Sequence, residues 1–337
     1  MSYERHIQIL TTHDPTEHNQ MTTKPFLAAL AACSLASGAG AQDDAQDPGQ
    51  WRLEPAGDLS GFLDCFEAEE KALISAHRGG PTPGLPENGI ETMDAVLTAI
   101  PAIMEIDVAQ STDGVLYLMH DRTLDRTTTG TGRVSDRDWA YVEQLKLVDE
   151  AGWQTTYSVP TLLAALEWAK DRTVLQIDFK RTADFADVIN LIRALDMADQ
   201  VILIAYTLEQ AQRLHELAPE MLLSYSIGSV GDLAEVEQAG IPADRIVAFT
   251  GTRLPKPDLY RALDGEDVEV IFGTLGRSPN SIDNVIDRFG TDERYVEISG
   301  GGVDVIATDR PREAAAALAE AERLPTEGVC GVSRGKS

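Results

Sequence analysis

Eight short apolar, β-prone runs recur along this chain, and helix-length segments separate most of them. Strands that are apolar almost throughout are typical of a parallel sheet covered by helices on its faces. Eight such units predict a closed (β/α)8 barrel of the TIM type, and a doubly wound open sheet is the alternative. The expected strands are residues 72–76, 103–108, 174–179, 201–205, 222–226, 245–249, 268–272 and 304–308. The clearest expected helices are residues 158–170, 183–195, 208–217 and 232–239.

One connection is too short for a crossover helix. Only six residues separate the second expected strand from the apolar run 115–119, and they include the turn signal Thr-Asp-Gly. The run is therefore expected to return antiparallel to the second strand, as a β-hairpin arm. If Asp113 and Gly114 form the loop, His120 lies opposite Asp107 on the same face of the sheet.

The segment that follows this arm, about residues 121–160, is rich in Thr, Gly, Asp and Arg and is longer than a simple connector. Long loops in compact domains usually serve as lids or binding loops. We therefore expect a functional insertion at this point of the barrel.

Acidic residues outnumber basic ones about two to one. The chain has 28 Lys and Arg against 55 Asp and Glu, which gives a formal net charge of −27. This charge repels nucleic-acid backbones and anionic lipid surfaces, so we expect no nucleic-acid partner. An acidic protein that handles a phosphate must supply positive charge locally, from a metal ion or from a few arginines and lysines.

The N-terminal segment is expected to direct export. After Met21, the expected true start, a lysine, a short apolar stretch and the small residues 39–41 are arranged as in a secretory signal. A periplasmic or secreted protein is expected, with a lipid anchor on Cys33 as the alternative and no transmembrane helix. The expected organisation is an extension and signal peptide at 1–41, a flexible acidic leader at 42–65, the barrel at 66–325 and a tail at 326–337.

Two cysteines, Cys65 and Cys330, remain after such cleavage and lie near opposite ends of the expected domain. Chain termini often lie close together in a single domain. In an oxidising compartment the pair either closes into a disulfide or stays as two free thiols. Geometry decides between these outcomes, and the sequence leaves both open.

Three acids stand on expected strands. Glu105 and Asp107 are two residues apart, so their side chains share one face, and Asp178 lies near the end of the next strand. Buried carboxylates are costly unless a cation or hydrogen-bond donors meet them. Ligation by oxygen alone favours Mg²⁺ or Ca²⁺ over Zn²⁺. The alternative is a structural salt-bridge network that joins these acids to Arg78 and Lys180.

Two histidines complete a candidate site. His77 follows the first expected strand directly, and His120 ends the hairpin arm. A metal can neutralise phosphate oxygens, the planar fork of Arg78 can bind them, and two imidazoles can serve as base and acid. The sequence contains no Gly-rich phosphate loop and no Gly-x-Ser-x-Gly elbow. The residues thus favour phosphoryl chemistry.

Many short blocks, spread over residues 72–311, carry a more specific signal. They are His77-Arg78-Gly79, Pro86-Glu87-Asn88, Glu105-Ile106-Asp107-Val108, Thr112-Asp113-Gly114, His120-Asp121, Leu124-Asp125-Arg126-Thr127-Thr128, Pro160-Thr161-Leu162, Ile177-Asp178-Phe179-Lys180 and Thr308-Asp309-Arg310-Pro311. In their order and spacing these blocks resemble the glycerophosphodiester phosphodiesterases. The resemblance implies a TIM-type barrel with the insertion at about 121–160 and one divalent cation, Mg²⁺ or Ca²⁺. The roles it implies are metal ligation for Glu105, Asp107 and Asp178, general acid/base catalysis for His77 and His120, and orientation of the phosphate for Arg78, Glu87 and Lys180.

The activity expected from this resemblance is metal-dependent hydrolysis of a small-molecule glycerophosphodiester to sn-glycerol 3-phosphate and an alcohol. The alternatives are phospholipase-type cleavage of lysolipid diesters and a non-catalytic barrel that binds a phosphodiester. Two positions depart from the family. Asp178 stands where the family usually has Glu, and Phe272-Gly273-Thr274-Leu275 replaces a Trp-Thr-Val-Asn block, which leaves the alcohol group open.

Overall fold

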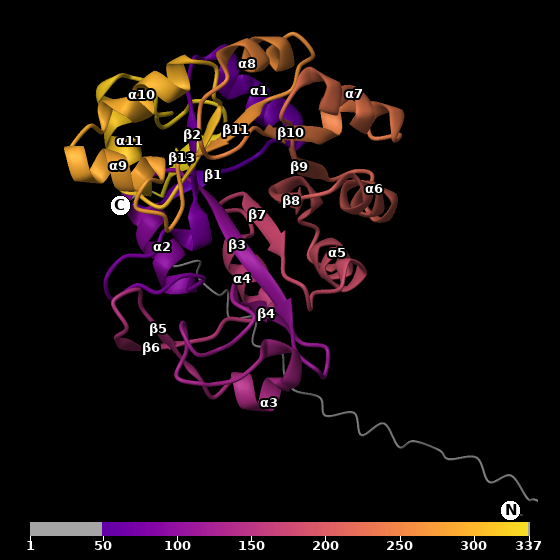
Figure 1. Cartoon of the computed structure of the whole chain (residues 1–337), viewed down its shortest axis with the longest axis vertical. Helices are drawn as coiled ribbons and strands as arrows, with labels where there is room; N and C mark the ends of the chain where they lie inside the picture. The colour runs from indigo at the N-terminus through magenta and orange to yellow at the C-terminus, as the bar shows by residue number, and fades with distance from the viewer. Residues whose placement is uncertain (1–48, 336–337) are drawn as a thin grey trace, which may run out of the picture. The chain divides into compact units, whose positions relative to one another are not determined.

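The computed structural model describes residues 49–335. The expected signal peptide, Met21 and Cys33 lie outside these residues. Eight parallel strands close into a barrel, because β2 pairs with both β3 and β12 (Figure 1). This closure confirms the (β/α)8 barrel over the open sheet. In order around the barrel the strands are β2 (Leu73–Ala76), β3 (Ile103–Gln110), β7 (Leu175–Phe179), β8 (Val201–Ala205), β9 (Leu222–Ser226), β10 (Ile246–Phe249), β11 (Val270–Gly273) and β12 (Val305–Thr308).

Helices follow the barrel strands and cover the outer face of the sheet in one continuous hydrophobic core. Side-chain caps define several of their starts; the Asp184 carboxylate, for example, accepts from the backbone N–H of Ala186 and Asp187. Within the described residues, no helix combines the length and hydropathy needed to cross a membrane. The covering helices are α2 (Ile90–Ala99), α4 (Leu162–Ala169), α5 (Phe185–Ala194), α6 (Leu208–Leu217), α7 (Val230–Gln238), α8 (Pro257–Asp264), α9 (Ile282–Phe289), α10 (Glu293–Gly300) and α11 (Pro311–Glu320). Short 3-10 turns are η1 (His77–Gly79), η2 (Val134–Asp136), η3 (Ala198–Gln200) and η4 (Ala243–Arg245).

The helix α1 (Leu59–Ala68) closes the amino-terminal end of the barrel. Its buried Phe62 and Phe66 belong to a second hydrophobic cluster, together with one apolar residue at or next to the start of each barrel strand. These strand residues are Leu73, Ile103, Val174, Ile202, Leu222, Val247, Ile271 and Val305. Catalytic groups in such barrels lie at the opposite, carboxyl-terminal end of the strands.

The two ends of the described chain meet beside α1. Strand β1 (Trp51–Leu53) pairs antiparallel with β13 (Val332–Arg334), and Cys65 forms a disulfide with Cys330 across a Cα–Cα distance of 5.7 Å. The structure therefore differs from the expected flexible leader at 42–65 and tail at 326–337. Parts of both segments form regular structure because they bury apolar side chains at the closed end of the barrel.

The hairpin arm forms as expected, but the register between its two strands differs from the expected one. Strand β4 (Leu116–Leu118) returns antiparallel to β3 after a loop of three residues that ends in Gly114 at φ 90°. The expected loop had two residues, so the pairing shifts by one. The backbone N–H of Met119 donates to the carbonyl of Asp107 at 2.9 Å, which places Met119 rather than His120 opposite Asp107. His120 follows the end of β4, and it still lines the cavity described below.

The insertion at 121–160 carries its own small core. Its short elements are α3 (Trp139–Val142), β5 (Lys146–Val148) and β6 (Gln154–Ser158), and the two strands pair with each other. Buried Leu124, Val134 and Leu147 pack with Tyr117 of the hairpin arm. The insertion is thus a folded extension of the arm on one side of the barrel.

Candidate active site

Three carboxylates converge inside the barrel. Glu105 and Asp107 lie on β3, and Asp178 lies on β7 in direct register with Asp107. Laterally paired residues of parallel strands point to the same face, so the register brings the second and third acids together. One oxygen from each of the three lies within 4.8 Å of the others, and none of the residues is more than 7% exposed.

Asp107 is the best-supported acid of this group. Asn88 donates from Nδ2 to Asp107 Oδ2 at 2.7 Å and accepts from the Asp107 backbone N–H at 2.9 Å. Lys180 Nζ lies 2.5 Å from Asp107 Oδ1 and 2.6 Å from Asp178 Oδ2. Burial alone would raise the pKa of Asp107, but the charges of Lys180, His120 and Arg78 hold that pKa below its usual range. This acid is therefore ionised at neutral pH.

The other two acids, Glu105 and Asp178, can still bind a further positive charge. Glu105 accepts from the backbone N–H of Arg78 at 2.7 Å, while burial and the charge of Asp107 raise its pKa to about 8. Asp178 accepts from Tyr206 Oη at 2.7 Å on one oxygen, but its other oxygen, Oδ1, is buried without a hydrogen-bond partner among residues 49–335. A hard divalent cation fits this set of oxygen donors, since it would bind the unpartnered oxygen and relieve the repulsion. The expected convergence is confirmed, and part of the alternative salt-bridge network, through Lys180, is present as well.

Each candidate histidine is anchored by its own carboxylate. His77 Nδ1 lies 2.6 Å from Asp309 Oδ1, and the backbone N–H of Gly276 donates to the other oxygen of Asp309 at 2.8 Å. A carboxylate only accepts, so Nδ1 of His77 carries the proton and Nε2 remains for a substrate. Burial lowers the pKa of His77, but the hydrogen bond to Asp309 and the charge of Glu105 raise it above its usual value overall.

His120 has a different environment. Its Nδ1 lies 2.7 Å from Asp121 Oδ1, and Asp121 is itself paired with Arg126 at 2.6 Å. Burial lowers the pKa of His120 below its usual value, and the charges of Lys180 and Arg78 act in the same direction. The pKa values of the two imidazoles are therefore shifted in opposite directions, upward for His77 and downward for His120.

Glu87 organises the arginines of the site. The two carboxylate oxygens of Glu87 accept two hydrogen bonds from the guanidinium of Arg126, at 2.6 and 2.8 Å. Both oxygens also accept from Arg78 Nη1, at 3.1 and 3.2 Å. The Nε of Arg78 stays buried without a hydrogen-bond partner among the described residues. Glu87 thus holds guanidinium groups in place, and Arg78 Nε lies 3.7 Å from Asp107 Oδ2.

The backbone around Arg78 is unusual. Arg78 adopts a left-handed conformation, with φ 52°, and Gly79 follows at φ 78°. A Cβ on Gly79 would lie 2.6 Å from Met93 Cγ, so glycine is required for the close packing of η1 against α2. This turn directs the backbone N–H of Arg78 at Glu105.

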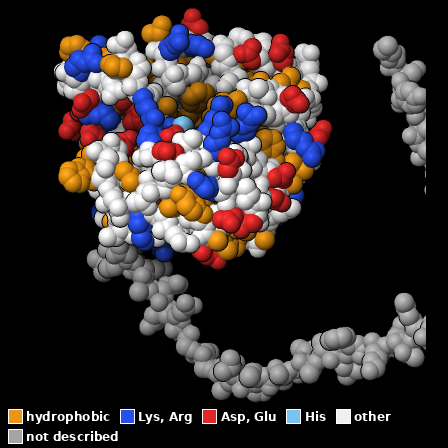
Figure 2. All heavy atoms as spheres, turned by 60° about the horizontal axis from the view of Figure 1, so that its bottom comes forward, with side chains coloured by type: hydrophobic (Ala, Val, Ile, Leu, Met, Phe, Trp, Pro, Cys, Tyr) orange, Lys and Arg blue, Asp and Glu red, His pale blue; other side chains and the backbone are white. Residues whose placement is uncertain are grey.

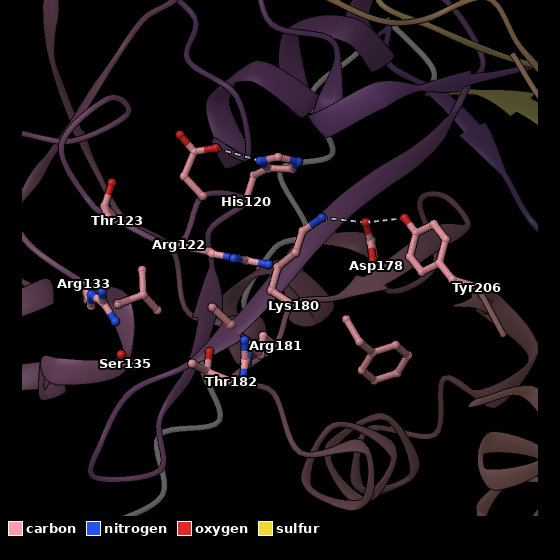
Figure 3. A pocket seen from close by; sticks show the side chains of 14 residues that line it. His120, Arg122, Thr123, Arg133, Ser135, Asp178, Lys180, Arg181, Thr182 and Tyr206 are labelled. Carbon is pink, nitrogen blue, oxygen red and sulfur yellow. Dashed lines mark hydrogen bonds and ion pairs between the residues drawn. The ribbon is translucent and has the colours of Figure 1, made fainter. Parts of the chain in front are cut away.

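A cavity of about 1000 Å³ opens beside these groups. His120, Asp178, Lys180 and Tyr206 line its inner part, and the side chains of Lys180 and Tyr206 both point at Asp178 (Figure 3). On the surface, a histidine lies in a hollow flanked by Lys and Arg side chains (Figure 2). The positive charge that a phosphate needs is therefore concentrated here, in a chain whose net charge is −27.

The structure adds residues to which the sequence assigned no role. Asn88, Asp121, Arg126 and Asp309 all fall within the quoted blocks, so their presence in those blocks was the available signal. Tyr206 follows β8 in a segment with no such signal. Only the fold places its hydroxyl on Asp178.

Comparisons with known proteins agree with this geometry. Residues 77–230 match the model of the glycerophosphoryl diester phosphodiesterase family. Mouse glycerophosphodiester phosphodiesterase 1 is 30% identical over 128 residues, which cover 37% of this chain and 38% of the mouse protein. The chain thus aligns with well under half the length of that curated relative.

Solved structures match over a longer stretch. A glycerophosphoryl diester phosphodiesterase from Parabacteroides distasonis is 29% identical with a TM-score of 0.73, and the match covers 85% of this chain and all of that one. An Oleispira antarctica phosphodiesterase, solved with the product sn-glycerol-3-phosphate, is 18% identical with a TM-score of 0.57. The match covers 75% of this chain and 98% of the Oleispira chain, and at this identity it supports the fold alone. The closed barrel is thus similar to the glycerophosphoryl diester phosphodiesterase family over residues 77–230, and to a solved structure of that name over the whole of its length.

Proposed function

We propose that this protein hydrolyses glycerophosphodiesters to sn-glycerol 3-phosphate and an alcohol, with one divalent cation, Mg²⁺ or Ca²⁺. The observation that carries the proposal is the convergence of three buried carboxylates with two imidazoles, each imidazole held by a carboxylate of its own. The P. distasonis structure and the mouse relative bear names that state this activity. The Oleispira structure names the product.

Glu105, Asp107 and Asp178 would hold the cation, which supplies positive charge to the phosphate oxygens when it is bound. The guanidinium of Arg78 binds the phosphate, and Glu87 keeps that guanidinium oriented. Lys180 balances Asp107 and Asp178 and contributes a second positive charge beside the phosphate.

The two histidines move protons at their Nε2 atoms, since each Nδ1 is engaged by a carboxylate. His120 removes a proton from the attacking hydroxyl, which belongs either to water or to the glycerol of the substrate. His77 donates a proton to the oxygen of the leaving alcohol. General acid/base catalysis of this kind contributes about 10²- to 10⁴-fold.

The proposal includes export of the protein to the periplasm or beyond the cell. The disulfide between Cys65 and Cys330 supports it, because such bonds persist mainly in oxidising compartments. Lipid anchoring at Cys33 is the alternative, and labelling of the protein with a radioactive fatty acid in cells distinguishes the two.

The direct test is an assay of purified protein with glycerophosphocholine and glycerophosphoethanolamine, with Mg²⁺ or Ca²⁺ and with a chelator. We expect release of sn-glycerol 3-phosphate that the chelator abolishes. His120→Ala should remove turnover, whereas His215→Ala on α6, outside the site, should retain it. A folded, metal-loaded protein that releases no phosphate ester from any diester would refute the proposal.

A further inference from the structure

Three arginines line the outer part of the cavity: Arg122, Arg133 and Arg181. All three are exposed, and within residues 49–335 none of their guanidinium groups forms an ion pair or a side-chain hydrogen bond. Elsewhere on this acidic chain arginines generally find carboxylates, as Arg310 does with Asp292 at 2.7 Å. The cavity wall therefore holds an uncompensated concentration of positive charge.

These arginines come from two walls of the cavity. Arg122 and Arg133 belong to adjoining segments of the insertion, since Thr123 forms a β-bridge with Arg133 and the N–H of Val134 donates to the carbonyl of Arg122 at 3.0 Å. Arg181 follows Lys180 at the end of β7, on the barrel side. Figure 3 shows the three side chains around the open space beyond His120 and Lys180.

The acids of the catalytic group do not account for this charge. Asp107 and Asp178 are already paired with Lys180, and Asp121 is paired with Arg126. Three like charges around one hollow repel one another and raise the local positive potential, which attracts an anion from solvent. The arrangement is therefore complementary to a negative charge on a bound molecule, at a position beyond the reacting phosphate.

This inference rests on the proposed function. We propose that the outer cavity binds an anionic alcohol group, so that the preferred substrates are glycerophosphodiesters whose alcohol carries a second negative charge, as a phosphate or a carboxylate. The reacting phosphate would bind beside Arg78 and the three converging carboxylates, and the glycerol of the substrate is uncharged. Only the alcohol can supply the anion that the three arginines complement. The hydroxyls of Thr123, Ser135 and Thr182 on the same walls can donate to its oxygens.

Matched substrates test the charge preference. Glycerophosphoglycerol, its terminal phosphate ester and glycerophosphoglycerate differ in whether the alcohol ends in a hydroxyl, a phosphate or a carboxylate. Glycerophosphocholine adds a cationic alcohol. We expect kcat/KM for the two anionic diesters to exceed that for glycerophosphocholine by about tenfold or more, and the ratio to fall at high ionic strength. The phosphate and carboxylate arms show which anion the site prefers.

Variants assign the preference to these residues. Arg133→Gln and Arg181→Gln should each lower the ratio of kcat/KM, anionic over cationic diester, and the double variant should bring it close to one. Arg213→Gln on the outer helix α6, outside the cavity, is the matched control and should leave the ratio unchanged. A ratio at or below one in the wild-type protein, or a ratio that the double variant retains, would overturn the inference while the enzyme still turns over. Absence of turnover with every diester would instead refute the proposed function.

Discussion

The two ends of the barrel both hold buried carboxylates, but they neutralise them in different ways. At the carboxyl end, Asp107 and Asp178 share the ammonium of Lys180. At the amino end, Glu269 directly precedes β11 and is 2% exposed, yet neither of its oxygens has a hydrogen-bond donor among the described residues. Asp304 directly precedes β12, and its carboxylate accepts from the backbone N–H of Val270 at 2.7 Å.

The pKa values reflect this difference. Burial, together with the neighbouring Asp64, raises the pKa of Glu269 to about 10. Burial likewise raises the pKa of Glu67 on α1 to about 8 and that of Asp304 to about 6. Arg323 lowers the pKa of Asp304 without reversing the effect of burial. Glu269 and Glu67 therefore keep their protons at neutral pH, whereas Asp304 is mostly ionised there.

A cluster of acids is thus not by itself a cation site. Glu269 is as buried as the carboxyl-end acids, and what differs is the supply of donors and positive charge around it. Lys180 and Arg78 keep Asp107 ionised, whereas burial raises the pKa of Glu105 to about 8. At the amino end, Glu67 of α1 and Glu269 beside β11 are instead neutral at pH 7.

Matched carboxylate-to-amide substitutions should separate the two ends most clearly. Asp107→Asn should lower kcat/KM by about 10³-fold or more, because a ligand to the cation is lost and metal charge stabilisation is worth several kcal/mol. Glu269→Gln should leave kcat/KM within about twofold. Steady-state assays with metal titration measure both, with circular dichroism to confirm folding. Equal losses for the two variants would show that the amino-end acids also serve the reaction.

Removal of the disulfide should affect the stability of the amino end but not the chemistry. Replacing both Cys65 and Cys330 by Ser should lower the free energy of unfolding by about 2–5 kcal/mol, because the bond closes a very long loop in the unfolded chain. Turnover at a temperature where the variant is folded should be retained. Urea unfolding of the oxidised protein, the reduced protein and the double variant measures the effect. Two free thiols in the oxidised wild-type protein would contradict the structure.

Asp309 tests how far the carboxyl end depends on orientation. Asp309→Asn should lower kcat by about 10²-fold, because an amide no longer fixes the tautomer of His77. The basic limb of the pH–kcat profile should also move to lower pH, since the hydrogen bond to Asp309 raises the pKa of the acid. Asp292→Asn, which alters a neighbouring ion pair with Arg310, is the control. An unshifted pH profile would mean that Asp309 has only a structural role.

The last prediction concerns how the free energy of unfolding depends on pH. The pKa of Glu269 is about 10 in the folded state and about 4.3 when unfolded, so the folded chain retains a proton that the unfolded chain releases. The resulting stabilisation is complete below about pH 4 and is lost as the pH rises toward 10, with a slope of up to about 1.4 kcal/mol per pH unit. Glu269→Gln should flatten this decline between pH 6 and 9 in urea unfolding, whereas Glu266→Gln, an exposed neighbour, should not. Parallel profiles for all three proteins would argue against a protonated Glu269.

The barrel strands could be predicted because buried parallel strands are continuous apolar runs, and all eight lie within about two residues of the expected bounds. The carboxylate group could be predicted for a similar reason, since acids in apolar runs are conspicuous. The hairpin register could not, because a loop of two or three residues is compatible with the same turn sequence. The supporting contacts of Asp309 and Tyr206 depend on segments that are distant in the chain.

From its residue pattern alone, the chain specifies eight strand–helix units and places acids and histidines at strand ends, since periodicity and local composition are properties of the sequence. The tertiary structure alone decides that Cys65 meets Cys330, that each histidine has its own carboxylate, and that three unpaired arginines face one hollow. These facts depend on distances between segments remote in the chain. Barrel closure sets those distances, and no local pattern encodes them.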